Sequence, residues 1–484
     1  MAKRKRNLNG DSDAAPLPVQ SKKVKETDAF PSQVNTTIQI IAGSYDRVLH
    51  GITVTILPKE DAQFADTFLF NAHASAIRSL ALSPPSAPVP KQSQKIILAS
   101  GSTDERINLY HLSAHAPSKI TVPVIPSLTT KAVVENPQNR ELGSLLHHSS
   151  TVTALYFPNR SKLLSSAEDS TIAVTRTRDW SLLSTIKAPI PKPVGRPSGD
   201  TAPLGGAPSG INDFAVHPST KLMISVGKGE KCMRLWNLVT GKKAGVLNFE
   251  RSMLGEVGEG RFSSGEGRKV AWGSSDVGEE FCVAFERGVL VFGMDSKPRC
   301  KAVPEPRSKI HQICYVQVAE DDGLQILAVS TEDGRILFYS TISKNLSPSP
   351  AKVVDEKDTP LPSAKLIAQL GGKDAGFTGR IKDFVALSLR NDTSNQLLIV
   401  TGGSDGALRV WKLFASEDLI PHSGATRQVG QLLGTYETAN RITCLKAFVM
   451  LPKAEGVEDD MEPSDDFEGF DDDGESESDG MDSD

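Results

Sequence analysis

Carboxylate side chains recur at the end of short turns made of small residues, and they are the first candidates for acid–base chemistry. Seven such acids each follow an apolar run and precede a strand-like segment: Asp46, Asp104, Asp169, Glu230, Glu286, Asp333 and Asp405. A catalytic site requires a few carboxylates with convergent partners. Seven acids at equivalent places instead predict a structural role, in which each carboxylate accepts backbone N–H hydrogen bonds and fixes its turn.

Histidines near the repeat starts are the second set of candidates, because imidazole binds metals and transfers protons near neutral pH. They are His73, His147, His148, His217 and His311. The chain has no H-E-x-x-H motif, and its five scattered cysteines form no C-x-x-C pair. We therefore expect no catalytic residue, metal, cofactor or small-molecule substrate. The cysteine usage is typical of a reducing compartment such as cytosol or nucleus.

Strands must position these acids. In five repeats an aromatic residue follows the acid by six positions: Tyr110, Trp236, Phe292, Tyr339 and Trp411. A second pattern, apolar at i, i+3 and i+5, precedes most turns, as in Ile77/Leu80/Leu82, and predicts inner strands packed on both faces. The acids are 47 to 72 residues apart, because polar or Pro-rich insertions lengthen the repeats. We expect these insertions to be surface loops: Pro84–Gln94, Pro117–Arg140, Pro189–Gly210, Ser347–Ser363 and Ser416–Val429.

The two ends of the repeat array each lack a part. The last inner strand, within Asn440–Leu451, has no acidic turn after it, and Asp46 has no inner strand before it. Pairing the C-terminal strand with Thr36–Leu57 completes one blade and leaves no open edge. The sequence thus predicts an all-β, seven-bladed WD40 β-propeller over residues 36–452. In WD repeats a histidine often hydrogen-bonds the turn acid of its own blade, which predicts the pairs His73–Asp104 and His148–Asp169.

Charge divides the chain into three regions, although its net charge is only −5. Residues 1–35 are expected to be a disordered basic arm, and residues 453–484 a disordered acidic tail with 16 acidic and no basic residues from Glu455 onward. The arm carries two basic clusters that fit a bipartite nuclear import signal: Lys3, Arg4, Lys5 and Arg6, then Lys22, Lys23 and Lys25. The alternative is a basic arm that touches RNA non-specifically. No apolar run is long enough to span a membrane.

A further set of cations occupies equivalent positions in the last three repeats. Lys309, Arg380 and Arg441 precede the first apolar residue of their inner strands, where the first three repeats have Ala76, Thr151 and Gly210. Equivalent positions of neighbouring blades lie side by side. With Lys382 these three residues therefore predict a "basic arc" at the rim of the central channel, which contacts a phosphate backbone or an acidic protein segment. The alternative is a set of unrelated surface cations.

Several segments resemble one family of WD-repeat proteins, the maintenance-of-killer or PAK-interacting-protein-like family. The segments are Ile41–Gly51, Leu146–Ser149, Ser165–Asp169, His217–Leu222, Ser225–Gly227, Arg234–Gly241, Ser404–Gly406 and Asn440–Leu445, and the likeness spans about residues 38–451. The resemblance implies a non-enzymatic nuclear and nucleolar scaffold that joins precursors of the large ribosomal subunit and supports rRNA processing. Its implied partners are pre-ribosomal proteins and pre-rRNA. The alternative that it implies is an adaptor that negatively regulates a PAK-type kinase.

Overall fold

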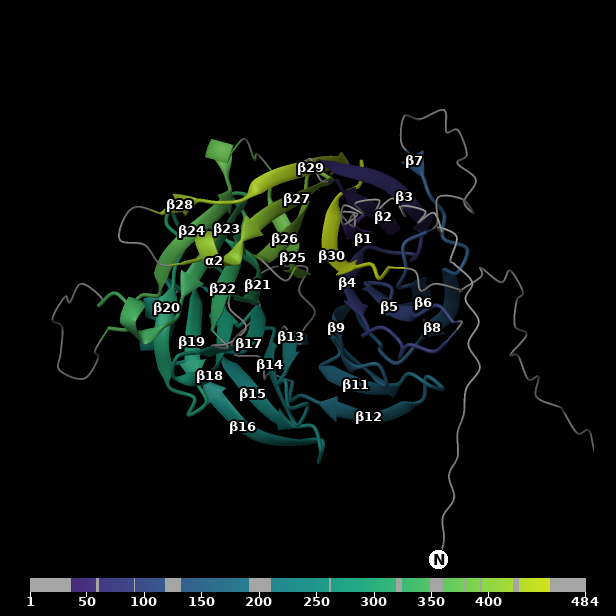
Figure 1. Ribbon diagram of the computed structural model, residues 1–484. Coiled ribbons are helices and arrows are strands. Elements are labelled where there is room, and N and C mark those ends of the chain that lie inside the picture. The colour runs from purple at the N-terminus through teal and green to yellow at the C-terminus, as the bar shows by residue number, and fades with distance from the viewer. Residues whose placement is uncertain are drawn as a thin grey trace, which may run out of the picture. The chain divides into compact units, whose positions relative to one another are not determined.

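The structure is a computed structural model, and it describes residues 36–57, 61–90, 92–117, 132–190, 210–260, 263–318, 324–348, 360–375, 377, 379–391, 394–420 and 426–452. The predicted basic arm with its import signal and the predicted acidic tail lie outside the described residues. The described residues, all from Thr36 onward, belong to one compact unit. Within it, seven antiparallel sheets circle a common axis as the blades of a propeller (Figure 1).

Each blade is built on four antiparallel strands, to which blades 1 and 6 add a short fifth strand, and in six blades the first strand along the chain lies innermost. The blades are numbered along the chain, and their strands are as follows: blade 1, β1 (Thr36–Ser44), β2 (Val48–Ile56), β3 (Ala62–Asn71) and β30 (Ile442–Val449); blade 2, β4 (Ile77–Leu82), β5 (Lys95–Ser102), β6 (Ile107–Ser113) and β8 (Arg140–Leu145); blade 3, β9 (Val152–Asn159), β10 (Lys162–Ala167), β11 (Thr171–Arg176) and β12 (Leu182–Lys187); blade 4, β13 (Ile211–Val216), β14 (Leu222–Gly227), β15 (Cys232–Asn237) and β16 (Lys242–Asn248); blade 5, β17 (Lys269–Ser275), β18 (Gly278–Ala284), β19 (Val289–Gly293) and β20 (Pro298–Ala302); blade 6, β21 (Ile310–Gln317), β22 (Gln325–Thr331), β23 (Arg335–Ser340) and β24 (Lys365–Gly371); blade 7, β25 (Ile381–Asn391), β26 (Ser394–Gly403), β27 (Ala407–Phe414) and β29 (Gln431–Glu437).

Blade 1 closes the ring by combining both ends of the described chain. β30 is its innermost strand and pairs antiparallel with β1, with Ile38 opposite Val449 and Gly43 opposite Cys444. The Met450 amide also donates to the Thr37 carbonyl oxygen at 2.8 Å. The predicted seven-bladed propeller, closed by its N- and C-terminal strands, is confirmed.

Small residues before the acidic turns let neighbouring blades approach closely. A Cβ atom at Gly101 of β5 would lie 2.6 Å from Val152 of the next inner strand, and one at Gly402 of β26 would lie 2.9 Å from Ile442. Because β-carbons do not approach so closely, a larger residue there would push the blades apart. The buried aliphatic residues of the inner and second strands fill the spaces between sheets, as Ile40 and Ile52 do against Val400 and Leu408.

Two of the insertions that we expected to be surface loops each contribute a short strand to a sheet. β7 (Ala132–Val133) pairs in parallel with β3 of blade 1, and β28 (Arg427–Gln428) pairs in parallel with β24 of blade 6. Each covers an outer edge that would otherwise expose unpaired backbone groups. The described helical segments are short: α1 (Arg251–Glu256), α2 (Ala415–Asp418), and the 3-10 turns η1 (Ser343–Asn345) and η2 (Lys373–Ala375). In the described part of the chain, no helix has the length and apolar character needed to cross a membrane.

Candidate functional site

Four of the seven predicted turn acids accept backbone hydrogen bonds. Asp46 accepts from the Arg441 amide at 3.2 Å. Asp104 accepts from the amides of Ala74 and Arg106. Asp169 and Asp405 accept from the amides two residues later, at 2.9 and 3.2 Å. These carboxylates tie the turn between the second and third strands of a blade to itself or to the inner strand.

The other three turn acids contact cationic side chains instead. Glu230 pairs with the Arg234 guanidinium, and Asp333 pairs with that of Arg335 at 2.6 Å. Glu286 lies 3.7 Å from both Arg268 and Lys309.

The predicted histidine–acid pairs both form, and they share one geometry. His73 Nδ1 lies 3.1 Å from Asp104 Oδ2, and its Nε2 lies 2.8 Å from the Ser100 hydroxyl. In the next blade, His148 Nδ1 lies 3.2 Å from Asp169 and its Nε2 lies 2.8 Å from Ser165. Both serines are fully buried, so these triads join the repeat start to the middle of the second strand.

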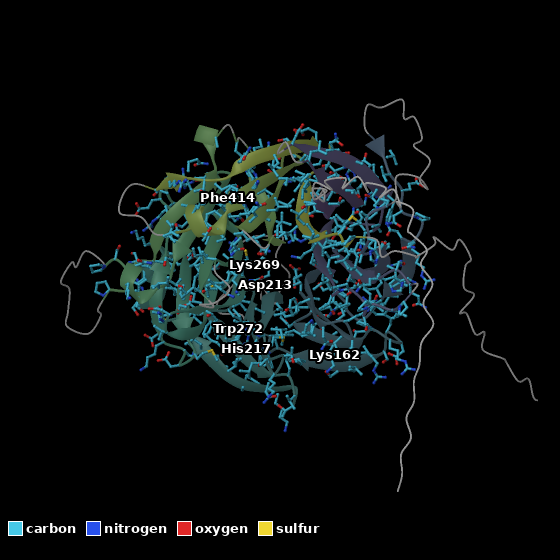
Figure 2. All side chains as sticks on the ribbon, viewed as in Figure 1. Lys162, Asp213, His217, Lys269, Trp272 and Phe414 are labelled. Atoms are coloured by element: carbon cyan, nitrogen blue, oxygen red, sulfur yellow. The ribbon has the colours of Figure 1, made fainter. Side chains whose placement is uncertain are left out.

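The remaining histidines that the sequence singled out are not members of these triads. His217 Nδ1 lies 2.8 Å from the Ser219 hydroxyl, and its ring packs edge-on against Trp272 (Figure 2). His147 is half-buried, and burial lowers its pKa. His311 belongs to the basic arc region described below. Within the described ranges, no group of three or more His, Cys, Asp or Glu residues has an arrangement that would hold a metal ion.

The five predicted repeat aromatics are all buried between blades: Tyr110, Trp236, Phe292, Tyr339 and Trp411. They differ in how their polar atoms are satisfied. Trp236 Nε1 donates to the Ser225 hydroxyl at 2.8 Å. Among the described residues, neither Trp411 Nε1 nor the Tyr339 hydroxyl has a hydrogen-bond partner.

The basic arc residues are at equivalent places in three adjacent blades. Each of the three that precede an inner strand accepts, through its carbonyl oxygen, a hydrogen bond from the turn of its own blade. The acceptor–donor pairs are Lys309–Glu332, Arg380–Ser404 and Arg441–Tyr45, at 2.8 to 2.9 Å. The inner strands of blades 6, 7 and 1 contact one another in that order around the ring. The backbone thus brings the basic arc together along one rim.

The cations of the basic arc act on one another's pKa. Burial lowers the pKa of Lys382; Glu332 opposes this shift, and Arg380, Arg441 and Lys309 add to it. His311, one residue beyond the first apolar residue of β21, has its pKa lowered to about 4 by burial and then by Lys382 and Lys309. Its Nε2 lies 3.4 Å from Lys382 Nζ. His311 is therefore neutral at physiological pH and adds no charge of its own.

Arg268 is a further cation beside the basic arc that the sequence pattern missed. Asp213 accepts a hydrogen bond from the Val270 amide, as Asp383 does from the Leu445 amide. Val270 therefore corresponds to Leu445, the fourth position of an inner strand, which puts Arg268 at the position of His311 and Lys382. The position could have been recognised from Gly267. This glycine lies against Val226 at the first position of the inner strand, where blades 6, 7 and 1 have an isoleucine.

Two buried acids hold neighbouring inner strands together. Asp213 lies beside Lys269 at 3.7 Å (Figure 2), and burial raises its pKa. Asp383 accepts from the Gln312 side-chain amide at 3.0 Å and from the Phe384 amide at 2.9 Å. Each acid bridges its own blade to the next, so these carboxylates are committed to strand-to-strand contacts.

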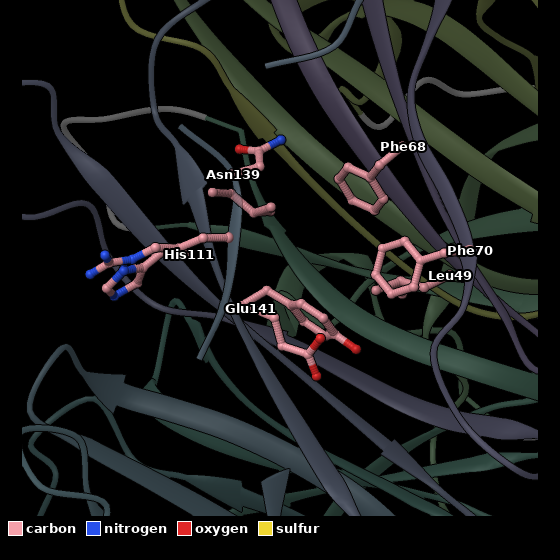
Figure 3. A pocket seen from close by; sticks show the side chains of 9 residues that line it. Leu49, Phe68, Phe70, His111, Asn139 and Glu141 are labelled. Atoms are coloured by element: carbon pink, nitrogen blue, oxygen red, sulfur yellow. The ribbon is translucent and has the colours of Figure 1, made fainter. Parts of the chain in front are cut away.

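A cavity of about 260 Å³ opens between β3 of blade 1 and β6 and β8 of blade 2 (Figure 3). Its walls are chiefly Leu49, Phe68, Phe70, Tyr110 and Leu112. His111 and Glu141 also line it. Burial lowers the pKa of His111 to about 4, which leaves the imidazole neutral at physiological pH. The cavity is a predominantly apolar recess.

Comparison with known proteins agrees with this architecture. The family described as "WD domain, G-beta repeat" matches residues 139–174, which span β8 to β11. A Gallus gallus protein named "p21-activated protein kinase-interacting protein 1-like" is 23% identical over 85% of this chain and 80% of its own length. "Protein MAK11" of Saccharomyces cerevisiae is 26% identical over 84% of this chain and 82% of its own.

A third relative carries a related name. "Shk1 kinase-binding protein 15" of Schizosaccharomyces pombe is 24% identical over 63% of this chain and 70% of its own length. These likenesses cover between 63% and 85% of this chain. Over most of its length, the chain is therefore a homologue of the proteins named MAK11 and PAK-interacting protein 1-like.

Proposed function

We propose that the chain is a non-enzymatic scaffold in ribosome biogenesis, which associates with precursors of the large ribosomal subunit and supports rRNA processing. The observation that carries the proposal is the basic arc, a cluster of cations on one rim of a rigid ring. A cationic rim favours partners rich in phosphate or carboxylate groups. The homology to MAK11 supports the same assignment through the family resemblance described above.

The non-enzymatic part of the proposal rests on how the carboxylates and histidines are used. Asp104 and Asp169 are engaged by turn amides and by buried His–Ser pairs. Asp213 and Asp383 bind the backbone of neighbouring inner strands. Groups held in this way stabilise the blades and leave the rim and its loops for docking.

A second candidate function is an adaptor that binds and negatively regulates a PAK-type kinase. It is favoured by the names of the relatives, which describe proteins that interact with p21-activated kinase or bind Shk1 kinase. Localisation separates the two functions, since a scaffold for ribosome assembly has to reach the nucleolus.

The deciding experiment is affinity purification of the tagged full chain with sequencing of the associated RNA and gradient sedimentation. Co-sedimentation with large-subunit precursors and recovery of their rRNA is the expected result. A chain that sediments free of precursors, yet recovers a PAK-type kinase, would replace the scaffold with the adaptor.

The import signal gives a second test of the scaffold. Neutralising Lys3–Arg6 and Lys22, Lys23 and Lys25 to glutamine should abolish nuclear and nucleolar enrichment of a fluorescent fusion. A heterologous import signal fused to that variant is the control, and it should restore the enrichment. Unchanged localisation of the neutralised variant would contradict the assigned role of these residues.

A further inference from the structure

The basic arc carries more positive charge than the carboxylates around it neutralise. Glu286 is 3.7 Å from Lys309 and from Arg268, and Glu332 is 3.0 Å from Arg380. In the described part of the chain, Lys382 and Arg441 form no ion pair, although the Asp46 carboxylate binds the Arg441 amide. Asp405, in the turn of blade 7, is already held by Arg409 at 3.1 Å. The rim therefore keeps cations available for an anionic ligand.

An exposed aromatic ring lies at one end of this cationic surface. The Arg441 guanidinium carbon lies 5.6 Å from the centre of the Tyr45 ring, and Tyr45 is 58% exposed. The turn that carries Tyr45 is fixed, because its amide donates to the Arg441 carbonyl oxygen at 2.8 Å. A solvent-facing ring, carried beside a guanidinium by a turn whose backbone is hydrogen-bonded, offers a π-face on which a base can stack.

From this arrangement we propose that the basic arc, Arg268 and Tyr45 form a binding surface for single-stranded RNA. The cations contact successive phosphates across blades 5, 6, 7 and 1, and the Tyr45 ring stacks one unpaired base at the end of the track. The proposal deepens the proposed function and rests on it only for the source of the RNA, which would be the rRNA precursor.

The ring is what favours RNA over an acidic peptide. Both ligands satisfy cations, but carboxylate side chains gain nothing from the exposed face of Tyr45, whereas every base has a π-face that stacks on it. Base stacking of this kind requires an unpaired strand, since the bases of a duplex already stack on one another. The surface thus fits a strand with alternating phosphates and accessible bases.

The first test uses purified full chain, a fluorescent oligouridylate and anisotropy at several salt concentrations. The arc variant is Arg380→Gln/Lys382→Gln/Arg441→Gln. The control is Lys162→Gln/Lys242→Gln/Lys243→Gln. It removes the same charge from exposed lysines in blades 3 and 4, which lie at the strand ends opposite the acidic turns. Losing three phosphate contacts should lower the slope of log K against log salt by about 2 and weaken binding about tenfold or more. The control should bind like wild type.

The second test isolates the aromatic ring. Tyr45→Ala should weaken oligouridylate binding about fivefold or more, because stacking contributes roughly 1–3 kcal/mol per base. It should leave the salt slope unchanged, because no charge is lost. Tyr45→Phe should bind like wild type. These single substitutions at an exposed turn keep the test decisive even if the arc variant fails to fold.

Three results would overturn the inference. The first is that the Tyr45→Ala and Arg441→Gln variants bind RNA with the same affinity as wild type. The second is that the chain binds duplex RNA more strongly than the single strand. The third is that the basic arc binds a poly-glutamate peptide in preference to RNA. Failure of the proposed function has a different signature: the wild-type chain would bind oligouridylate through the basic arc in vitro but would sediment free of large-subunit precursors. If the wild-type chain co-sediments with large-subunit precursors but does not bind oligouridylate, the RNA-binding surface is rejected and the proposed function stands.

Discussion

Tyr436 of β29 donates a hydrogen bond from its hydroxyl to the carboxylate of Asp66 in β3, 370 residues earlier in the chain. The same carboxylate lies 2.7 Å from His50 Nε2, and the Tyr436 ring packs beside Phe64 with centroids 5.5 Å apart. Blade 7 is thereby joined to the outer strands of blade 1. Ring closure thus rests on a second seam of contacts besides the pairing of β30 with β1.

Removing this hydroxyl should weaken ring closure. Tyr436→Phe deletes one hydrogen bond to a charged group in a part-buried site, which should lower the free energy of unfolding by about 1–3 kcal/mol. Chemical denaturation of the full chain measures the change. Tyr156→Phe is the matched control, since among the described residues the Tyr156 hydroxyl has no hydrogen-bond partner. Equal stability of the two variants would show that the Asp66 contact contributes nothing to the ring.

The ring itself was readable from sequence because its signals are local and repeated. The small-residue turns with an acid, and apolar residues such as Ile77 and Ile381 that begin inner strands, mark blades without knowledge of distant contacts. Closure followed from the two incomplete ends. By contrast, β7 and β28 are two-residue strands inside polar insertions, and so short a segment carries no periodicity.

The candidate site was only partly readable, for a different reason. Lys309, Arg380 and Arg441 align because each precedes a branched apolar residue in its inner strand. Blade 5 has Gly267 at that position, so no branched apolar residue marks Arg268 as an equivalent cation. The pairing of Tyr436 with Asp66 was missed as well, because no sequence periodicity relates the outer strands of different blades.

Acid should remove a part of the stability that depends on Asp169. Burial raises the pKa of this carboxyl, but hydrogen bonds from His148 and Thr171 outweigh burial and lower it to about 2. A carboxyl whose pKa is lower in the folded than in the unfolded state stabilises the fold above the unfolded pKa of about 3.9, and this stabilisation is lost as pH falls toward 2. Asp169→Asn should therefore be less stable than wild type at pH 7, by about 2 kcal/mol, with a difference that shrinks below pH 4.

The control for this pH dependence is Asp179→Asn in the same blade. The Asp179 side chain is about half exposed, so solvent screens its contact with Arg176. Hydrogen bonds from the Ser181 hydroxyl and amide lower the pKa of Asp179, as those from Thr171 do for Asp169, but the site is exposed, so this substitution should change the stability of the chain much less than Asp169→Asn between pH 2 and 7. A gap between wild type and Asp169→Asn that stays constant over this range would mean that protonation of Asp169 is not the cause.

The buried carboxylate of Glu280 should be costly to leave unpaired. Glu280 is fully buried and accepts hydrogen bonds from the Tyr315 hydroxyl at 2.9 Å and from the Arg299 guanidinium at 2.5 Å. Arg299→Met removes the balancing charge and should destabilise the chain by about 3–5 kcal/mol. Arg299→Met/Glu280→Gln should recover part of this loss, because the neutral amide no longer needs a cation. Strict additivity of the two substitutions in a denaturation cycle would refute the coupling.

The two repeat tryptophans allow one substitution to be compared at equivalent places of two blades. Trp236 faces Met223 and Trp411 faces Ile399 in the same register, but only Trp236 has its indole N–H satisfied, by Ser225. Trp236→Phe leaves the buried Ser225 hydroxyl without this partner, whereas Trp411→Phe removes a buried N–H that has no partner among the described residues. We therefore expect Trp236→Phe to lower the free energy of unfolding by about 1–3 kcal/mol more than Trp411→Phe. Thermal and chemical denaturation of both variants measures the difference, and a larger loss for Trp411→Phe would show that packing volume, rather than hydrogen bonding, sets the cost at this repeat position.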